Sequence, residues 1–83
     1  MKHQRHFGTT ASREAVKTMI LVADLNRIVQ IINEAINAEE KQAGVFDPFQ
    51  SGYPKRAREL AARRDNLTET IVALVQRLGA RSD

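Results

Sequence analysis

The chain has 83 residues, of which 13 are Lys or Arg and 10 are Asp or Glu, giving a formal charge of +3. This length allows one small domain, and such domains usually need a disulfide, a metal or a partner chain to complete their core. Because the chain has no cysteine, disulfides and thiolate metal sites are excluded. The positive charge is milder than that of a dedicated nucleic-acid binder. A partner chain is therefore the favoured source of additional stability.

The first residues, MKHQRHFGTT, are basic and lack the apolar run of a signal peptide. We expect a flexible tail over residues 1–9. His3 and His6 could bind a metal, but no acidic or thiol ligand lies near them in the sequence, so solvated histidines are favoured. No segment has the roughly 20 apolar residues of a membrane span. The sequence thus predicts a cytoplasmic protein with no metal, cofactor or membrane partner.

A long first helix is predicted over about residues 10–43, because hydroxyl side chains before it can cap its start and Gly44 can end it. Between Met19 and Ile36 the apolar residues recur at alternating steps of three and four, which is the pattern of a helix covered by other helices. This core stripe consists of Val22, Leu25, Val29, Ile32 and Ile36. Further apolar residues beside the stripe indicate that more than one neighbour packs against the helix.

The connector, residues 44–53, holds three of the four aromatic residues of the chain. Asp47, followed by Pro48, matches a capped helical turn that Gly52 would end. Phe46 and Phe49 either fold over the end of the helices or form an exposed platform for a ligand or a base, and the first interpretation is favoured.

A second helix is predicted over about residues 54–78, with Gly79 as its end and a frayed tail at residues 80–83. One face carries a heptad pattern with a single charged member: Ala57, Leu60, Arg64, Leu67, Ile71, Leu74 and Leu78. A connector of about ten residues makes the two helices antiparallel. The best register of their apolar faces pairs Leu21 with Leu78, Leu25 with Leu74, Ile28 with Ile71 and Ile32 with Leu67, and places Ala35 opposite Arg64.

The predicted fold is therefore all-α: an antiparallel two-helix hairpin, with residues 10–79 as its one domain. In this register the first helix extends beyond the second and leaves residues 11–20 uncovered. Large aliphatic groups left in water form a patch that soluble monomers seldom expose. We expect two hairpins to form a homodimeric four-helix bundle. The predicted dimer interface comprises Ala15, Val16, Met19, Ile20, Ile31, Val72 and Val75.

Basic residues are concentrated where the second helix begins. This cluster could bind an anion or a nucleic-acid backbone, with a tyrosine stacking on a base. Alternatively, Glu34, Glu39 and Glu40 lie opposite and pair with the arginines, and this interpretation is favoured. Arg64 would then pair with Glu34, with Glu39 or with an acid of a second chain. The candidate contact residues are Tyr53, Lys55, Arg56, Arg58, Arg63 and Arg64.

An enzyme needs an activated nucleophile, paired carboxylates of different pKa, or a metal. The predicted helices contain no His or Cys, and no Gly-rich phosphate loop occurs. The leading hypothesis is a non-enzymatic interaction or adaptor module that acts as a homodimer. Nucleic-acid binding is the alternative. A small-anion-binding helical enzyme that uses Arg27, Arg63 and Arg64 is the less favoured one.

Overall fold

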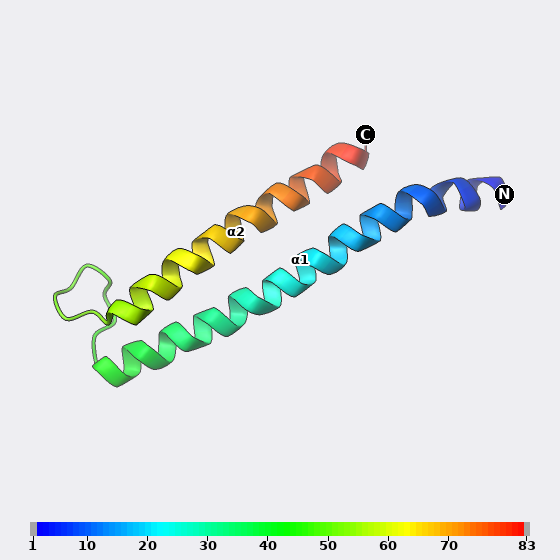
Figure 1. Cartoon of the computed structure of the whole chain (residues 1–83). Helices are drawn as coiled ribbons and strands as arrows, with labels where there is room; N and C mark the ends of the chain where they lie inside the picture. Colours follow the sequence, from blue (N-terminus) through cyan, green and yellow to red (C-terminus); the bar gives the residue numbers. More distant parts are fainter. Residues whose placement is uncertain (1, 83) are drawn as a thin grey trace.

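The computed structural model describes residues 2–82, and the side chains of residues 13–79 within them. Two helices, α1 (Lys2–Ala43) and α2 (Lys55–Ser82), lie side by side and run in opposite directions, joined by a short connector (Figure 1). The prediction of an all-α helical hairpin is thereby confirmed. α1 begins at Lys2, inside the tail predicted at residues 1–9, and α2 reaches Ser82, inside the frayed end predicted at residues 80–83. The mobility expected of these two end segments stays a prediction.

The end of α1 is set by Gly44, as predicted. Gly44 has a φ of 72°, in the left-handed region that costs a residue with a Cβ more than it costs glycine. Its amide donates a hydrogen bond of 2.8 Å to the carbonyl oxygen of Glu40, which satisfies one of the free carbonyls at the end of a helix. The chain therefore leaves α1 directly after Ala43.

The connector contains the capped turn that the sequence predicts. The Asp47 side chain accepts a 3.0 Å hydrogen bond from the amide of Phe49, and the Asp47 carbonyl accepts a 2.9 Å bond from the amide of Gln50. Gly52, with a φ of 92°, turns the chain back toward the helices. Asp47 and Gly52 thus shape this turn, and Lys55 begins α2 immediately after Pro54.

α2 continues through Gly79 to Ser82, whereas the sequence predicts that it ends at Gly79. The reason is conformational: Gly79 does not adopt a positive φ, unlike Gly44 and Gly52. A glycine that ends a helix commonly does so in the left-handed conformation, which Gly79 does not adopt. Gly79 is instead a helical residue without a side chain.

The core is small and lies near the connector. Among the described residues, Ile32, Ile36 and Ala57 are the buried hydrophobic ones. Partly buried side chains of the connector and α2 pack against them: Tyr53, Leu60, Ala61 and Leu67. Ala57 has no exposed surface, and its small side chain lets the two helices approach closely at this level.

The apolar faces predicted for the two helices pack against each other, but the row of α1 residues that meets α2 differs in part from the predicted pairs. Val22, Leu25 and Val29 are half-buried, whereas Leu21 and Ile28 are exposed. The predicted pairs that place Leu21 and Ile28 between the helices are therefore displaced by one residue, toward Val22 and Val29. The molecule measures 62 × 18 × 13 Å, which is a single layer of helices. Each helix thus has one neighbour and keeps most of its surface in solvent.

Candidate dimer interface and arginine cluster

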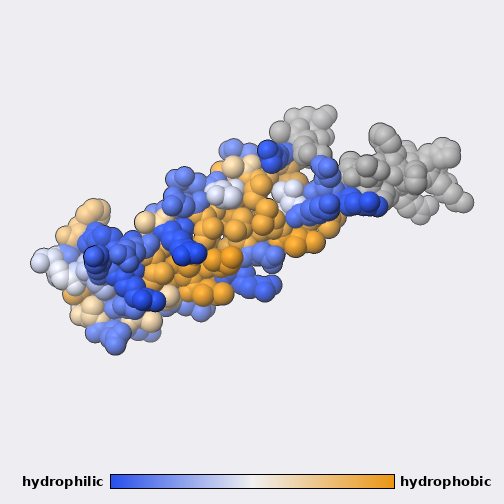
Figure 2. Space-filling view, viewed as in Figure 1, coloured by the Kyte–Doolittle hydropathy of each residue, from blue (hydrophilic) through white to orange (hydrophobic). Residues whose placement is uncertain are grey.

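Large aliphatic side chains are exposed along the hairpin. Ile31, for example, keeps 57% of its accessible surface, and Met19 and Ile20 keep similar fractions. Figure 2 shows an apolar band that runs along the middle of the molecule on the face turned to the reader. The exposed aliphatic residues of the described part are Val16, Met19, Ile20, Leu21, Ile28, Ile31, Val72 and Val75.

Two polar contacts between the helices identify the two sides of the hairpin. Arg56 of α2 forms an ion pair of 3.5 Å with Glu39 of α1, and Arg64 donates a hydrogen bond of 3.0 Å to the side-chain oxygen of Asn33. At about 100° per residue, Glu39 and Asn33 lie about 60° to either side of the buried Ile36. These contacts therefore lie on opposite faces, which we call the Glu39 face and the Asn33 face.

The exposed aliphatic residues divide between these faces. In α1, Leu21 and Ile28 lie about 60–80° from the direction of Ile36, on the Glu39 face. Ile20 and Ile31 lie further round on the same side, turned away from α2.

The Asn33 face carries aliphatic residues of both helices. In α2, Val72 lies about 160° around the helix from Arg56, and Val75 about 100°, so they belong to the Asn33 face. The same geometry puts Ala15 and Met19 of α1 on the Asn33 face and turns Val16 away from α2.

The seven residues of the predicted dimer interface are thus not one patch. Ile20 and Ile31 share a surface with Leu21 and Ile28, two residues that sequence reasoning assigned to the contact between the helices. A sequence signal for this second surface does exist, because Leu21, Ile28 and Ala35 repeat every seven residues beside the core stripe. The larger aliphatic surface belongs to α1 alone.

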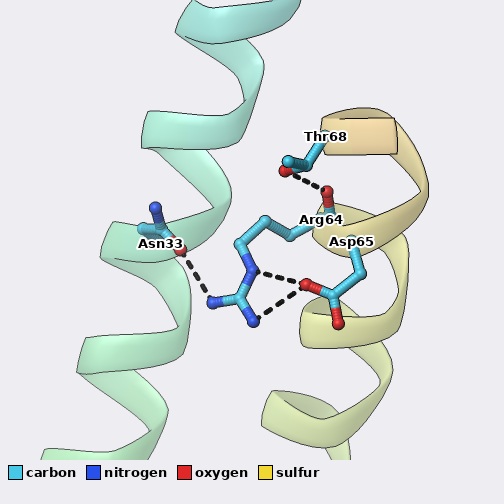
Figure 3. Close-up of polar contacts among 4 residues, drawn as sticks. All are labelled: Asn33, Arg64, Asp65 and Thr68. Carbon is cyan, nitrogen blue, oxygen red and sulfur yellow. Dashed lines mark hydrogen bonds and ion pairs between the residues drawn. The ribbon is translucent and has the colours of Figure 1, made fainter. Parts of the chain in front are cut away.

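Arg64 is held between the helices, where the sequence predicts it (Figure 3). Its guanidinium contacts Asn33 at 3.0 Å and the carboxylate of Asp65 at 3.1 Å, and its side chain retains one third of its surface. The prediction that an arginine of the cluster pairs with Glu39 is confirmed by Arg56, but Glu34 and Glu39 as partners of Arg64 were wrong. Glu34 lies about 160° from the direction of Ile36 and points away from α2, while Glu39 is paired with Arg56.

Tyr53 connects the connector to α1. Its hydroxyl donates a 2.6 Å hydrogen bond to the carboxylate of Glu40. This hydrogen bond, aided by partial burial and by the negative charge of Glu40, raises the pKa of Tyr53 above 10.0. The guanidinium of Arg58 lies 5.4 Å from the centre of the Tyr53 ring and donates a 2.9 Å bond to the carbonyl of Pro48. Tyr53 and Arg58 therefore hold the connector against the helices.

Most of the predicted anion-binding cluster is therefore engaged within the chain. Arg56, Arg58 and Arg64 each have a partner. Within the described residues, Lys55 and Arg63 have no hydrogen bond or ion pair, and both are exposed. The arrangement does not converge on a single enclosed anion site.

The expected packing of the connector phenylalanines over the helix ends is wrong. Phe49 is 95% exposed and Phe46 is 59% exposed. The turn around Asp47 carries this part of the connector beyond the ends of the helices (Figure 1), so neither ring reaches the core. Both rings are left at the tip of the hairpin.

Within the described residues, no three His, Cys, Asp or Glu side chains lie close enough together to hold a metal ion. His3 and His6 lie outside the described side chains. None of the described helical segments has the length and apolar character needed to cross a membrane. No protein-family model matches the chain, and comparisons with curated proteins and with solved structures find no similar protein.

Proposed function

We propose that the protein is a non-enzymatic helical interaction module that acts as a homodimer, with the contact between the two copies made through α1. The observation that carries this proposal is the exposed aliphatic surface of α1 on a hairpin that is only one layer thick. Complete burial of a large aliphatic side chain contributes about 1.5–3 kcal/mol, and these side chains keep about half of their surface, so covering each of them contributes about half of that. The residues of this surface are Ile20, Leu21, Ile28 and Ile31.

The total surface of the chain supports the same proposal. The hairpin exposes 6714 Å², whereas a compact monomer of 9.3 kDa exposes about 5000 Å². The excess, about 1700 Å², exceeds the roughly 800 Å² that each partner buries in a standard protein interface. Two copies that pack along their long axes can bury such an area, and together they would supply four helices.

Analytical ultracentrifugation at micromolar concentration tests the proposal. We expect a dimer for the unmodified protein, and an association weakened at least about tenfold by Ile31→Asp, because a charge then lies in the apolar contact. Val75→Asp is the matched control, since Val75 is similarly exposed on the opposite face. A monomer of 9.3 kDa, or a dimer that only Val75→Asp disrupts, would contradict the proposal.

Nucleic-acid binding is the second candidate, and the contacts at the start of α2 favour it less. Lys55 and Arg63 remain available, while the neighbouring arginines already have partners in the chain. A salt titration with generic RNA or duplex DNA distinguishes this candidate, because binding to phosphates weakens steeply as salt increases. Binding at low salt that is lost in a Lys55→Ala, Arg63→Ala double variant would support it.

A further inference from the structure

Six exposed residues form a second regular stripe on α1, on the side turned away from α2. They follow one another at steps of three and four, and therefore share one side of the helix. This outer stripe consists of Lys17, Ile20, Asp24, Arg27, Ile31 and Glu34. Its four charged side chains have no hydrogen bond or ion pair within the part of the chain that the structure describes.

The order of residues in the outer stripe is self-complementary. Read from its first residue to its last, the stripe is positive, isoleucine, negative, positive, isoleucine, negative. Read in reverse, every positive position becomes negative and every isoleucine stays an isoleucine. A second copy laid against it in the opposite direction therefore presents an opposite charge to each charge and an isoleucine to each isoleucine.

We propose that the dimer forms through the outer stripes of two α1 helices that run antiparallel, with the two connectors at opposite ends. Lys17 then lies next to Glu34 of the partner subunit, Ile20 next to Ile31 of the partner subunit, and Asp24 next to Arg27 of the partner subunit. The two-fold axis passes between Leu25 and Asn26 and repeats each contact once. This inference rests on the proposed homodimer and specifies its orientation and register.

Residues beside the outer stripe fit this register. In an antiparallel pair the same flank of each helix meets, so Leu21 comes to lie beside Ile28 of the partner subunit, and both side chains are exposed in the hairpin. The two-fold axis repeats this contact between Ile28 and Leu21 of the partner subunit. The contact thus covers four of the exposed aliphatic residues of α1, including both isoleucines of the stripe.

A parallel dimer in register lacks this complementarity. It would place Asp24 next to Asp24 of the partner subunit, and Arg27 next to Arg27 of the partner subunit. Like charges across a helix pair select against an arrangement, and opposite charges set the orientation and choice of partner. Apolar surface can be buried between the two copies in either orientation, whereas the charges favour only the antiparallel one.

Disulfide trapping in the full chain tests the orientation directly, since the chain has no cysteine of its own. An Ile20→Cys variant and an Ile31→Cys variant, each with a different tag, are mixed and oxidised. We expect the mixed disulfide to dominate, because the antiparallel register brings position 20 of one copy next to position 31 of the other. Dimers cross-linked mainly between two copies of the same variant would overturn the antiparallel register.

A charge exchange tests the pairing of Asp24 with Arg27 of the partner subunit. Asp24→Arg alone, or Arg27→Asp alone, creates two like-charge contacts in each homodimer, and we expect each to weaken association about tenfold. In an equimolar mixture of the two variants, both contacts become attractive again, so heterodimers should form with nearly the original affinity. Homodimers that bind as tightly as the heterodimer would overturn the register.

These outcomes separate the two proposals. If the unmodified protein is monomeric, the proposed homodimer fails and the antiparallel register fails with it. If it is dimeric but cross-links between identical positions, the homodimer is supported and only the antiparallel register is wrong. Both substituted positions in the charge exchange are exposed on the outer side of α1, so the hairpin itself should be unchanged, which circular dichroism can verify.

Discussion

The two halves of the hairpin differ in how much of their apolar surface they cover. The closed half, residues 30–66, includes the connector and contains the three buried hydrophobic residues of the described chain. The open half, residues 13–29 and 67–79, contains seven of the eight exposed aliphatic residues. The difference shows that one end of the hairpin completes a small core by itself, whereas the other presents its apolar side chains outward.

The polar contacts follow the same division. The contacts Tyr53–Glu40, Arg56–Glu39 and Arg64–Asn33 all lie in the closed half. They surround the small core, and each joins α1 to α2 or to the connector. The closed half therefore fixes how the two helices meet, and the open half is the part whose stability should depend most on a second copy.

The largest difference between the halves should appear on truncating a core side chain. Ile32→Ala removes a buried aliphatic group and leaves a cavity, so we expect a loss of about 2–4 kcal/mol in the free energy of unfolding. Val75→Ala, in the open half, removes a half-exposed side chain and should cost less than about 1 kcal/mol. Urea denaturation at one fixed protein concentration measures both. Equal losses would contradict the division into a closed and an open half.

Much of the fold can be predicted from the sequence, because it depends on local patterns. The alternation of apolar residues locates both helices, and Gly44, Asp47 and Gly52 specify the turn between them. The end of α2 could not be predicted in the same way. Whether Gly79 takes the left-handed or the helical conformation depends on the chain that follows it, and both conformations are open to glycine.

The candidate site was harder to predict. Two apolar rows run side by side on α1, one through Val22 and Val29 and the other through Leu21 and Ile28. Periodicity alone does not say which row meets α2, since a rotation of the helix by one residue exchanges them. The partner of Arg64 was missed for a related reason, because the same rotation brings Asn33 within its reach and turns Glu34 away.

A smaller difference between the closed and the open half should appear on replacing one glycine of each half by alanine. The two substitutions should change the free energy of unfolding in opposite directions. Gly44→Ala forces a Cβ into a residue with a φ of 72° and should lower the free energy of unfolding by about 1–2 kcal/mol. Gly79→Ala replaces a helical glycine and should raise it by about 0.5–1 kcal/mol. An added Cβ meets no atom of the surrounding structure within 4 Å at either position, so both effects come from the local backbone and not from packing against neighbours. Denaturant unfolding of both variants should give shifts of opposite sign, and shifts of the same sign would refute this account.

The smallest expected effect is a pH dependence confined to the closed half. The hydrogen bond to Glu40 raises the pKa of Tyr53 above its ordinary value of 10.0. A group whose pKa is raised on folding contributes stability below its unfolded pKa, and this contribution is lost as the pH rises through the folded value. The free energy of unfolding should therefore fall more steeply above pH 10 in the unmodified protein than in Tyr53→Phe.

Tyr53 is the only tyrosine and the chain has no tryptophan, so the ultraviolet absorbance of tyrosinate reports the ionisation of this one residue. Glu40→Gln removes the negative charge and weakens the hydrogen bond, and it should lower the pKa of Tyr53 toward its ordinary value. Glu34→Gln is the matched control, because Glu34 points away from α2. If the two variants titrated alike, Glu40 would not be the cause of the raised pKa, and the contact that joins the connector to α1 would have to be held by the Arg58 bond to Pro48 instead.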